Sequence, residues 1–172
     1  MSRLYQIQEQ VRRRTDEIAA AHWDWPCRKA CDECCRSLAA VPLVSEAEWR
    51  AIGEAIAALP ATLAEMVRAR IRESAGMTRP VVCPLLDVDG GLCLIYEARP
   101  VACRAYGFYA GREGVRGCSR IEAVSREAPD VIWGNHAALE ASLGALGRAA
   151  ELHVWLALSE SAKRAAAAES SC

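Results

Sequence analysis

The chain lacks a long hydrophobic run near its start. Residues 1–21 carry charged side chains throughout, so they contain no continuous apolar segment of the kind found in export signals or membrane spans. These charged residues are Arg3, Glu9, Arg12, Arg13, Arg14, Asp16 and Glu17. On this basis we expect a cytoplasmic protein with no membrane partner.

An excess of charge of either sign is also absent. The formal net charge is −1 and the pI is near 6.3, so no global field would collect nucleic acid or anionic membrane. The densest basic run is Arg12-Arg13-Arg14, and Asp16 and Glu17 follow it, which is typical of a solvated helix face. We therefore expect no nucleic-acid partner. The sequence identifies no protein partner, substrate or oligomeric state.

Cysteine, in contrast, is abundant. Eight of the nine cysteines fall in one arrangement: Cys27, Cys31, Cys34, Cys35, Cys83, Cys93, Cys103 and Cys118. Reducing conditions in the cytosol keep such thiols free, so a chain of this kind is metal-binding or redox-active rather than held together by disulfides. Free cysteine is also a common buried hydrophobe, but four within nine residues exceed what packing requires. Cys172 stands alone near the C-terminus, and we expect that it is not a ligand.

The predicted fold is mainly α, or α+β with one small β-hairpin, in a compact single domain over residues 1–172. Apolar residues at helical spacing predict helices over residues 4–18, 45–56 and 63–71. Ser45 and Glu48 form a capping-box pattern at the start of the second helix. Another helix is predicted near residues 139–146. Residues 152–158 fit either a strand or a buried helix, and residues 162–172 are predicted to be a frayed helix or a disordered tail.

A short hairpin is predicted where the pattern changes at residue 80. Its strands cover residues 81–86 and 92–96, with Cys83 on one strand, Cys93 on the other and the turn at Asp89-Gly90. Pro100 then begins a short helix that carries Cys103. A flexible loop with glycines at 111, 114 and 117 leads to Cys118.

The first four cysteines allow two local structures. On one helix they would share a single face; a looped knuckle is the alternative, because both geometries suit tetrahedral metal sites. Cys34 and Cys35 are adjacent, and we expect their side chains to diverge, so that one mononuclear ion would not bind both comfortably. Two metals, or a cluster with several corners, would use them better.

Three segments carry a family resemblance: residues 27–36 (CRKACDECCR), residues 83–86 (CPLL) and residues 93–106 (CLIYEARPVACRAY). They resemble the bacterial CxxCxxCC cysteine-cluster family of the YkgJ type, a zinc- or iron-chelating domain. The family-like core spans about residues 24–118, and its departure from the pattern is the three-residue gap between Cys27 and Cys31. The resemblance implies metal binding by all eight cysteines. It also favours iron slightly, as ions or as an iron–sulfur cluster, over zinc.

Several functions fit these observations. The first is a metal-binding protein that holds iron, an iron–sulfur cluster or zinc, with a possible redox or metal-dependent role. The alternatives are a metal- or iron–sulfur-dependent modifying enzyme, related by analogy to protein lysine methylation, and a zinc-stapled interaction domain. The spacing Cys27-x3-Cys31-x2-Cys34 also matches radical S-adenosylmethionine enzymes, whose fold needs more strand–helix units than this sequence offers. No catalytic residue is identified.

Outside the eight cysteines, two kinds of side chain stand near the motif. Arg36 and Arg104 directly follow cysteines and are candidates to offset thiolate charge or to bind an anionic ligand, with ordinary structural pairing as the alternative. Tyr96 and Tyr106 are expected to pack over the site rather than to react.

Overall fold

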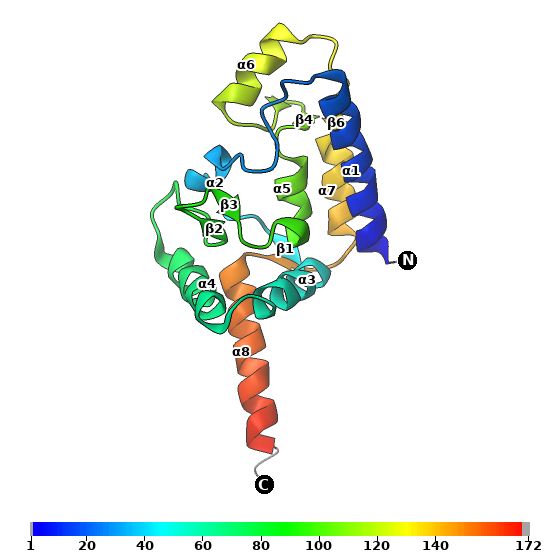
Figure 1. The fold of residues 1–172 in the computed structure, drawn as a ribbon. Coiled ribbons are helices and arrows are strands. Elements are labelled where there is room, and N and C mark those ends of the chain that lie inside the picture. The colour runs from blue at the N-terminus through cyan, green and yellow to red at the C-terminus, as the bar shows by residue number, and fades with distance from the viewer. Residues whose placement is uncertain (1, 170–172) are drawn as a thin grey trace.

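The computed structural model describes residues 2–169, and helices make up 57% of it, as the sequence predicts. Figure 1 shows α1 and α7 side by side at one edge, α5 in the middle, and α8 projecting beyond the rest of the fold. The α-helices are α1 (Arg3–Ala21), α2 (Glu33–Arg36), α3 (Glu46–Ala57), α4 (Ala61–Glu73), α5 (Val101–Ala105), α6 (Ser119–Glu127), α7 (His136–Gly144) and α8 (Leu152–Glu169). Two 3-10 turns, η1 (Ser74–Gly76) and η2 (Tyr96–Ala98), complete the helical elements of the described chain.

The strands are short and form three small sheets. They are β1 (Val44–Ser45), β2 (Leu86–Asp87), β3 (Leu92–Cys93), β4 (Tyr109–Gly111), β5 (Gly114–Val115), β6 (Gly134–Asn135) and β7 (Ala149–Ala150). β1 pairs with β7 and β2 with β3, both antiparallel, and β4 lies between antiparallel β5 and parallel β6. The strands therefore connect helices rather than build a core of their own.

α1 follows the predicted pattern. Its apolar stripe of Leu4, Ile7, Val11 and Ile18 is buried, because spacings of three, four and seven place these side chains on one face. On the outer face Arg12 pairs with Glu9 at 2.9 Å and with Asp16 at 2.8 Å. This confirms that the basic run belongs to a solvated helix face.

The capping box of α3 is present and has a second function. Ser45 Oγ accepts a hydrogen bond from Glu48 N at 3.3 Å, and Glu48 Oε2 accepts one from Ser45 N at 2.9 Å. The other carboxylate oxygen of Glu48 accepts from Val101 N at 2.9 Å, at the first residue of α5. One buried carboxylate thus satisfies orphan N–H groups at the start of two helices.

Two hydrophobic clusters form the interior. The α4–α8 cluster gathers residues of α3, α4 and α8, including Ile52, Val67 and Leu152. The α1–α5 cluster gathers residues of α1, α5, α6 and α7, including Val11 and Val101. The cysteines pack against both: Cys83 and Cys93 touch the α4–α8 cluster, and Cys27 and Cys118 touch the α1–α5 cluster. The thiols therefore lie where the two clusters meet.

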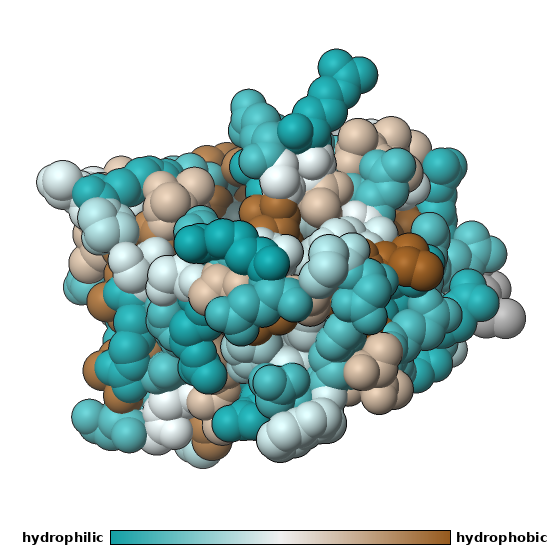
Figure 2. All heavy atoms as spheres, turned by 90° about the horizontal axis from the view of Figure 1, so that it is seen from above, coloured by the Kyte–Doolittle hydropathy of each residue, from teal (hydrophilic) through white to brown (hydrophobic). Residues whose placement is uncertain are grey.

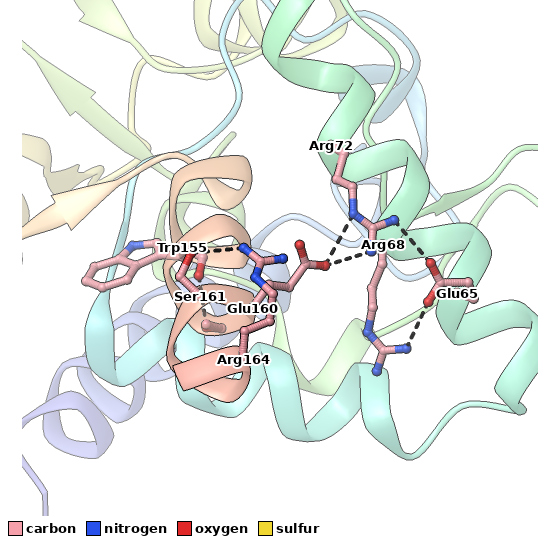
Figure 3. Close-up of polar contacts among 8 residues, drawn as sticks. Glu65, Arg68, Arg72, Trp155, Glu160, Ser161 and Arg164 are labelled. Atoms are coloured by element: carbon pink, nitrogen blue, oxygen red, sulfur yellow. Dashed lines mark hydrogen bonds and ion pairs between the residues drawn. The ribbon is translucent and has the colours of Figure 1, made fainter. Parts of the chain in front are cut away.

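Charged side chains join α4 to α8 on the surface. Figure 3 shows Arg72 between Glu65, at 3.1 Å, and Glu160 of α8, at 2.7 Å. Because these groups lie at the surface, water and salt screen the ion pairs, and their contribution to stability is small. Figure 2 views the molecule from its α6 end and shows a mostly hydrophilic face with scattered hydrophobic residues.

The structure corrects two sequence-based expectations near the cysteines. The hairpin is shorter than predicted, so Cys83 lies in the loop before β2 and only Cys93 is on a strand. The glycine segment is not a simple loop, because β4 and β5 pair across it and Cys118 then caps α6, a helix that was not predicted. The physical reason is that Gly114, with φ of +109°, supports a tight turn.

The C-terminal region is helical as far as the structure describes it. α8 includes residues 152–158, so the buried-helix alternative is correct there, and it continues through residues 162–169. Cys172 lies outside the described residues. No helix in the described chain is long and apolar enough to cross a membrane.

Candidate metal centre

The first four cysteines lie on a looped knuckle rather than on one helix. Only Glu33–Arg36 is helical, and Ala30, with φ of +69°, turns the chain sharply before it. The single-face alternative is therefore wrong, since Cys27 and Cys31 precede α2. A hydrogen bond from Cys31 N to Arg28 O at 3.0 Å closes this turn.

Four thiols gather on the side of the α1–α5 cluster: Cys27, Cys31, Cys34 and Cys118, called here the first thiol set. Burial, with the neighbouring thiols of Cys31, Cys118 and Cys34, raises the pKa of Cys27 to about 12. Cys118 joins from the start of α6, which is tied to α2 through Glu33. The Glu33 carboxylate accepts from Ser119 Oγ at 3.4 Å and lies 3.7 Å from Arg120 Nη1.

The other four thiols, Cys35, Cys83, Cys93 and Cys103, form the second thiol set. Backbone bonds hold their segments together: Leu38 and Val81 exchange two hydrogen bonds of 2.8 and 2.9 Å, and Cys83 N donates to Cys35 O at 2.7 Å. Leu86 is paired with Cys93 across the β2–β3 hairpin. Cys103 comes from α5, whose start is held by the Glu48 carboxylate.

Burial also affects the second thiol set. Burial and the thiols of Cys35, Cys34 and Cys93 raise the pKa of Cys103 to about 12. The Cys34 thiol lowers the pKa of Cys35, but the Cys83 thiol and burial raise it by more, to about 12. Burial likewise raises the pKa of Cys93. Without a bound metal, these groups are neutral thiols at pH 7.

The two thiol sets meet at Cys34 and Cys35. Their sulfur atoms are 4.0 Å apart, so the side chains do not diverge as expected. Two thiolates on one tetrahedral zinc ion stand about 3.8 Å apart, given Zn–S bonds of about 2.3 Å, so the distance between Cys34 and Cys35 does not by itself assign them to one metal or to two. The hydrogen bond with Cys35, together with burial, raises the pKa of Cys34 well above its usual range.

The donor chemistry fits a soft or borderline metal. Each thiol set offers four sulfur atoms, and four thiolates are the ligand set of structural zinc and of iron–sulfur clusters. In residues 2–169, no three cysteine, histidine, aspartate or glutamate side chains already have metal-binding geometry. The sets are thus defined by neighbouring thiols rather than by a finished coordination shell.

Two hollows border the thiols. One of about 360 Å³ lies toward the β2–β3 hairpin, and one of about 390 Å³ lies toward α1. Cys31, Cys34 and Cys103 line both. Tyr106 lines both as well, and it also lines a third hollow of about 530 Å³ between α3, α5 and α7. The thiols are therefore accessible from two directions.

The basic residues near the motif differ in their contacts. Arg36 pairs with Asp32 at 2.6 Å and donates to Val88 O at 2.8 Å, which ties α2 to the hairpin turn. Arg36 therefore has the ordinary structural pairing that the sequence left open as an alternative to offsetting thiolate charge. Arg104 instead donates to two backbone carbonyls, those of Arg99 and Glu97. Burial and the charge of Arg99 lower the pKa of Arg104.

A comparison with protein families bears on this arrangement. Residues 26–128 match the family model "CxxCxxCC: Putative zinc- or iron-chelating domain". The chain belongs to the CxxCxxCC family. The match covers more than half of the chain and confirms the predicted resemblance, and it extends past Cys118 through α6. Neither a curated protein nor a solved structure matches the chain.

Membership of the CxxCxxCC family makes this a metal-chelating domain of the zinc or iron type. Sequence reasoning identified the cysteines but missed three residues that place them. Glu33 holds α6 against α2, and Glu48 holds the start of α5. Gly107 leaves room for Cys27, whose sulfur lies closer to the position of a Cβ than van der Waals contact allows. The capping-box pattern predicted that Glu48 caps α3, but no sequence pattern predicted its hydrogen bond to Val101.

Proposed function

We propose that this protein holds metal in two adjacent four-thiolate sites, one in the first thiol set and one in the second. The observation that supports this is that Cys27 has Cys31, Cys34 and Cys118 as neighbouring thiols, whereas Cys35 and Cys103 both have Cys93 as a neighbour and Cys35 also has Cys83. Cys34 lies near both groups, and we assign it to the first because four thiolates then complete each site. The metal would supply the positive charge that stabilises its ligands as thiolates.

Each site would join segments that are far apart in the sequence. The first thiol set connects the knuckle to α6, and the second connects α2 to the hairpin and to α5. Metal binding in such a site is coupled to folding, because the ligands are brought together only in the folded chain. We therefore expect metal to stabilise the contact between the α4–α8 and α1–α5 clusters.

We propose iron, as ions or as iron–sulfur clusters, rather than zinc. Zinc held by four thiolates is closed and chemically inert, and its function is structural. Here Cys31, Cys34 and Cys103 border hollows of about 360 and 390 Å³, and access of this kind suits a redox or ligand-binding role. The zinc-stapled interaction domain has no comparable observation in its favour.

A second candidate function is a metal-dependent modifying enzyme. The hollow of about 530 Å³ favours it, because this hollow shares Tyr106 and Ala102 with the hairpin-side hollow that Cys103 lines. A molecule bound there would have only α5 between itself and the thiols. We assign no catalytic role to any side chain, because the metal would supply the chemistry.

The test is metal analysis with an absorption spectrum on protein purified without oxygen. We expect iron in both sites of the parent, with about half of it lost in Cys27→Ser and the other half lost in Cys103→Ser. Cys172→Ser is the control and should keep the parent content. Zinc alone would reject iron, and loss of all metal or of none in both single variants would reject two separate sites.

The adjacent pair provides a sharper comparison. If Cys34 and Cys35 belong to different sites, Cys34→Ser and Cys35→Ser should change the spectrum in different ways and lower metal content separately. If both variants kept the parent spectrum and full metal content, neither thiol would be an essential ligand. Loss of all metal in both variants would indicate a single shared centre.

A further inference from the structure

Arg99 occupies an unusual position beside the second thiol set. Its side chain is half-buried, its Cζ lies 3.6 Å from the centre of the Tyr96 ring, and its Nε donates to Tyr96 O at 3.0 Å. The guanidinium is therefore held in one place by stacking and by a hydrogen bond. Within the described chain, no carboxylate forms an ion pair with it.

The charge of Arg99 reaches thiols from three separate segments. It interacts electrostatically with Cys34 of α2, Cys93 of β3 and Cys103 of α5. Arg99 also lines both hollows that border the thiols. A cation at this position faces the place where the thiolates of the second thiol set would gather.

Arg104 adds a second cation on the same side. It is half-buried, donates from Nε to Arg99 O at 2.9 Å and from Nη2 to Glu97 O, and interacts with Cys103. Among residues 2–169 it likewise forms no ion pair with a carboxylate. The Glu97 carboxylate offsets part of the Arg104 charge from a distance. Two neighbouring half-buried guanidiniums with no ion pair in the described chain are still unfavourable unless further negative charge offsets them.

The thiolate site has the required charge. Four thiolates around a divalent ion carry a net charge of about −2, and so do four thiolates around an oxidised four-iron cluster. We propose that Arg99 and Arg104 balance the charge of the metal-bound second thiol set, with Arg99 as the positioning residue that Tyr96 holds in place. This inference rests on the proposed two-site function, but it does not depend on which metal is bound.

Arg36 provides a matched comparison on the same motif. It also lies next to a cysteine in the sequence, but its charge is already neutralised by Asp32 at 2.6 Å. Arg36→Gln and Arg99→Gln remove the same charge from the protein. A difference between them would therefore report the position of Arg99 and not the net charge of the chain.

The experiment is a titration of the full-length, metal-free protein with Co²⁺, whose absorption bands report tetrahedral thiolate ligation. Removal of partners outside the metal ligands typically costs 10–100-fold in metal affinity. We expect Arg99→Gln to weaken Co²⁺ binding at the second site by at least about tenfold, and by clearly more than Arg36→Gln, which breaks a structural contact but leaves Arg99 in place. Arg99→Lys, which keeps the charge, should recover most of the affinity.

The outcomes separate the two proposals. If the parent binds no Co²⁺ through thiolates, the proposed function fails. If the parent binds and Arg99→Gln binds as tightly as Arg36→Gln, this inference fails and the proposed function stands. Equal weakening in Arg99→Gln and Arg99→Lys would also overturn it, because the charge would not be the cause. Should Arg99→Gln not fold, as judged by circular dichroism, Arg104→Gln carries the same comparison.

Discussion

Gly107 provides a direct test of where Cys27 lies. Gly107 has φ of +84°, and a Cβ at this position would overlap Cys27 Sγ and lie 3.4 Å from Cys27 Cβ. Gly107→Ala therefore has two costs. The backbone cost of a left-handed alanine is about 1–2 kcal/mol, and the methyl group must also push the Cys27 sulfur away.

The displacement decides the effect on the metal. The overlap requires the sulfur to move by roughly 1 Å, whereas metal–ligand distances vary by only about 0.2 Å. We expect Gly107→Ala to lose the metal of the first thiol set, or about half of the total. The second thiol set should keep its metal, because none of its cysteines is among the close neighbours of Gly107.

Gly114→Ala is the matched control. Gly114 has φ of +109° and nothing within 4 Å of the position of a Cβ, so it has the backbone cost without the overlap. At 2–4 °C per kcal/mol for a chain of this size, the control should lower the Tm by about 2–8 °C and keep its metal. Calorimetry and metal analysis of both variants test this. Equal metal content in Gly107→Ala and Gly114→Ala would refute the placement of Cys27.

Three further predictions follow from the fold. Complete removal of metal by a chelator should lower the Tm, because the thiols join the α4–α8 and α1–α5 clusters; an unchanged Tm in calorimetry would contradict this. Glu48→Ala should destabilise the protein by about 3 kcal/mol or more in urea unfolding, because buried N–H groups of Ser45 and Val101 lose their acceptor; a loss under 1 kcal/mol would contradict it. In the metal-free protein, burial raises the pKa of Cys103 from 9.0 to about 12, so the folded state holds this proton more tightly than the unfolded state. The contribution of this group to the free energy of unfolding is complete below pH 9 and is lost as the pH rises toward 12. The urea midpoint should therefore decrease as the pH is raised from 8 to 10.5, and an unchanged midpoint would contradict this.

Local patterns predicted the helices well. The stripe from Leu4 to Ile18 and the capping box at Ser45 depend on residues within a few positions of one another, and both appear as predicted. The single-helix alternative for Cys27–Cys35 failed because spacing alone does not exclude a left-handed residue at Ala30. The hairpin was predicted too long, because Val81 and Leu85 are buried against the α4–α8 cluster, and Val81 bridges to Leu38 rather than to the second strand of the hairpin.

Contacts between distant segments were beyond the reach of sequence patterns. The bond of Glu48 to Val101 joins residues 53 positions apart, and the bond of Ser119 to Glu33 spans 86. The family-like segments identified all eight thiols, but their division into two sets depends on where α5 and α6 pack. The pairing of Arg36 with Asp32, and the lack of a carboxylate at Arg99 in the described structure, also became visible only in the folded chain.

The adjacency of Cys34 and Cys35 has a consequence for how the proposed sites fill. The two residues share one peptide bond, and their sulfurs are 4.0 Å apart. A metal bound by Cys34 would fix the backbone of α2 and so hold Cys35 in place for the neighbouring site. The second metal would then bind a ligand that is already ordered, so its binding would cost less conformational entropy. This is positive cooperativity between the two sites. Under this arrangement, each site would bind its metal more tightly when the other site is filled than when it is empty.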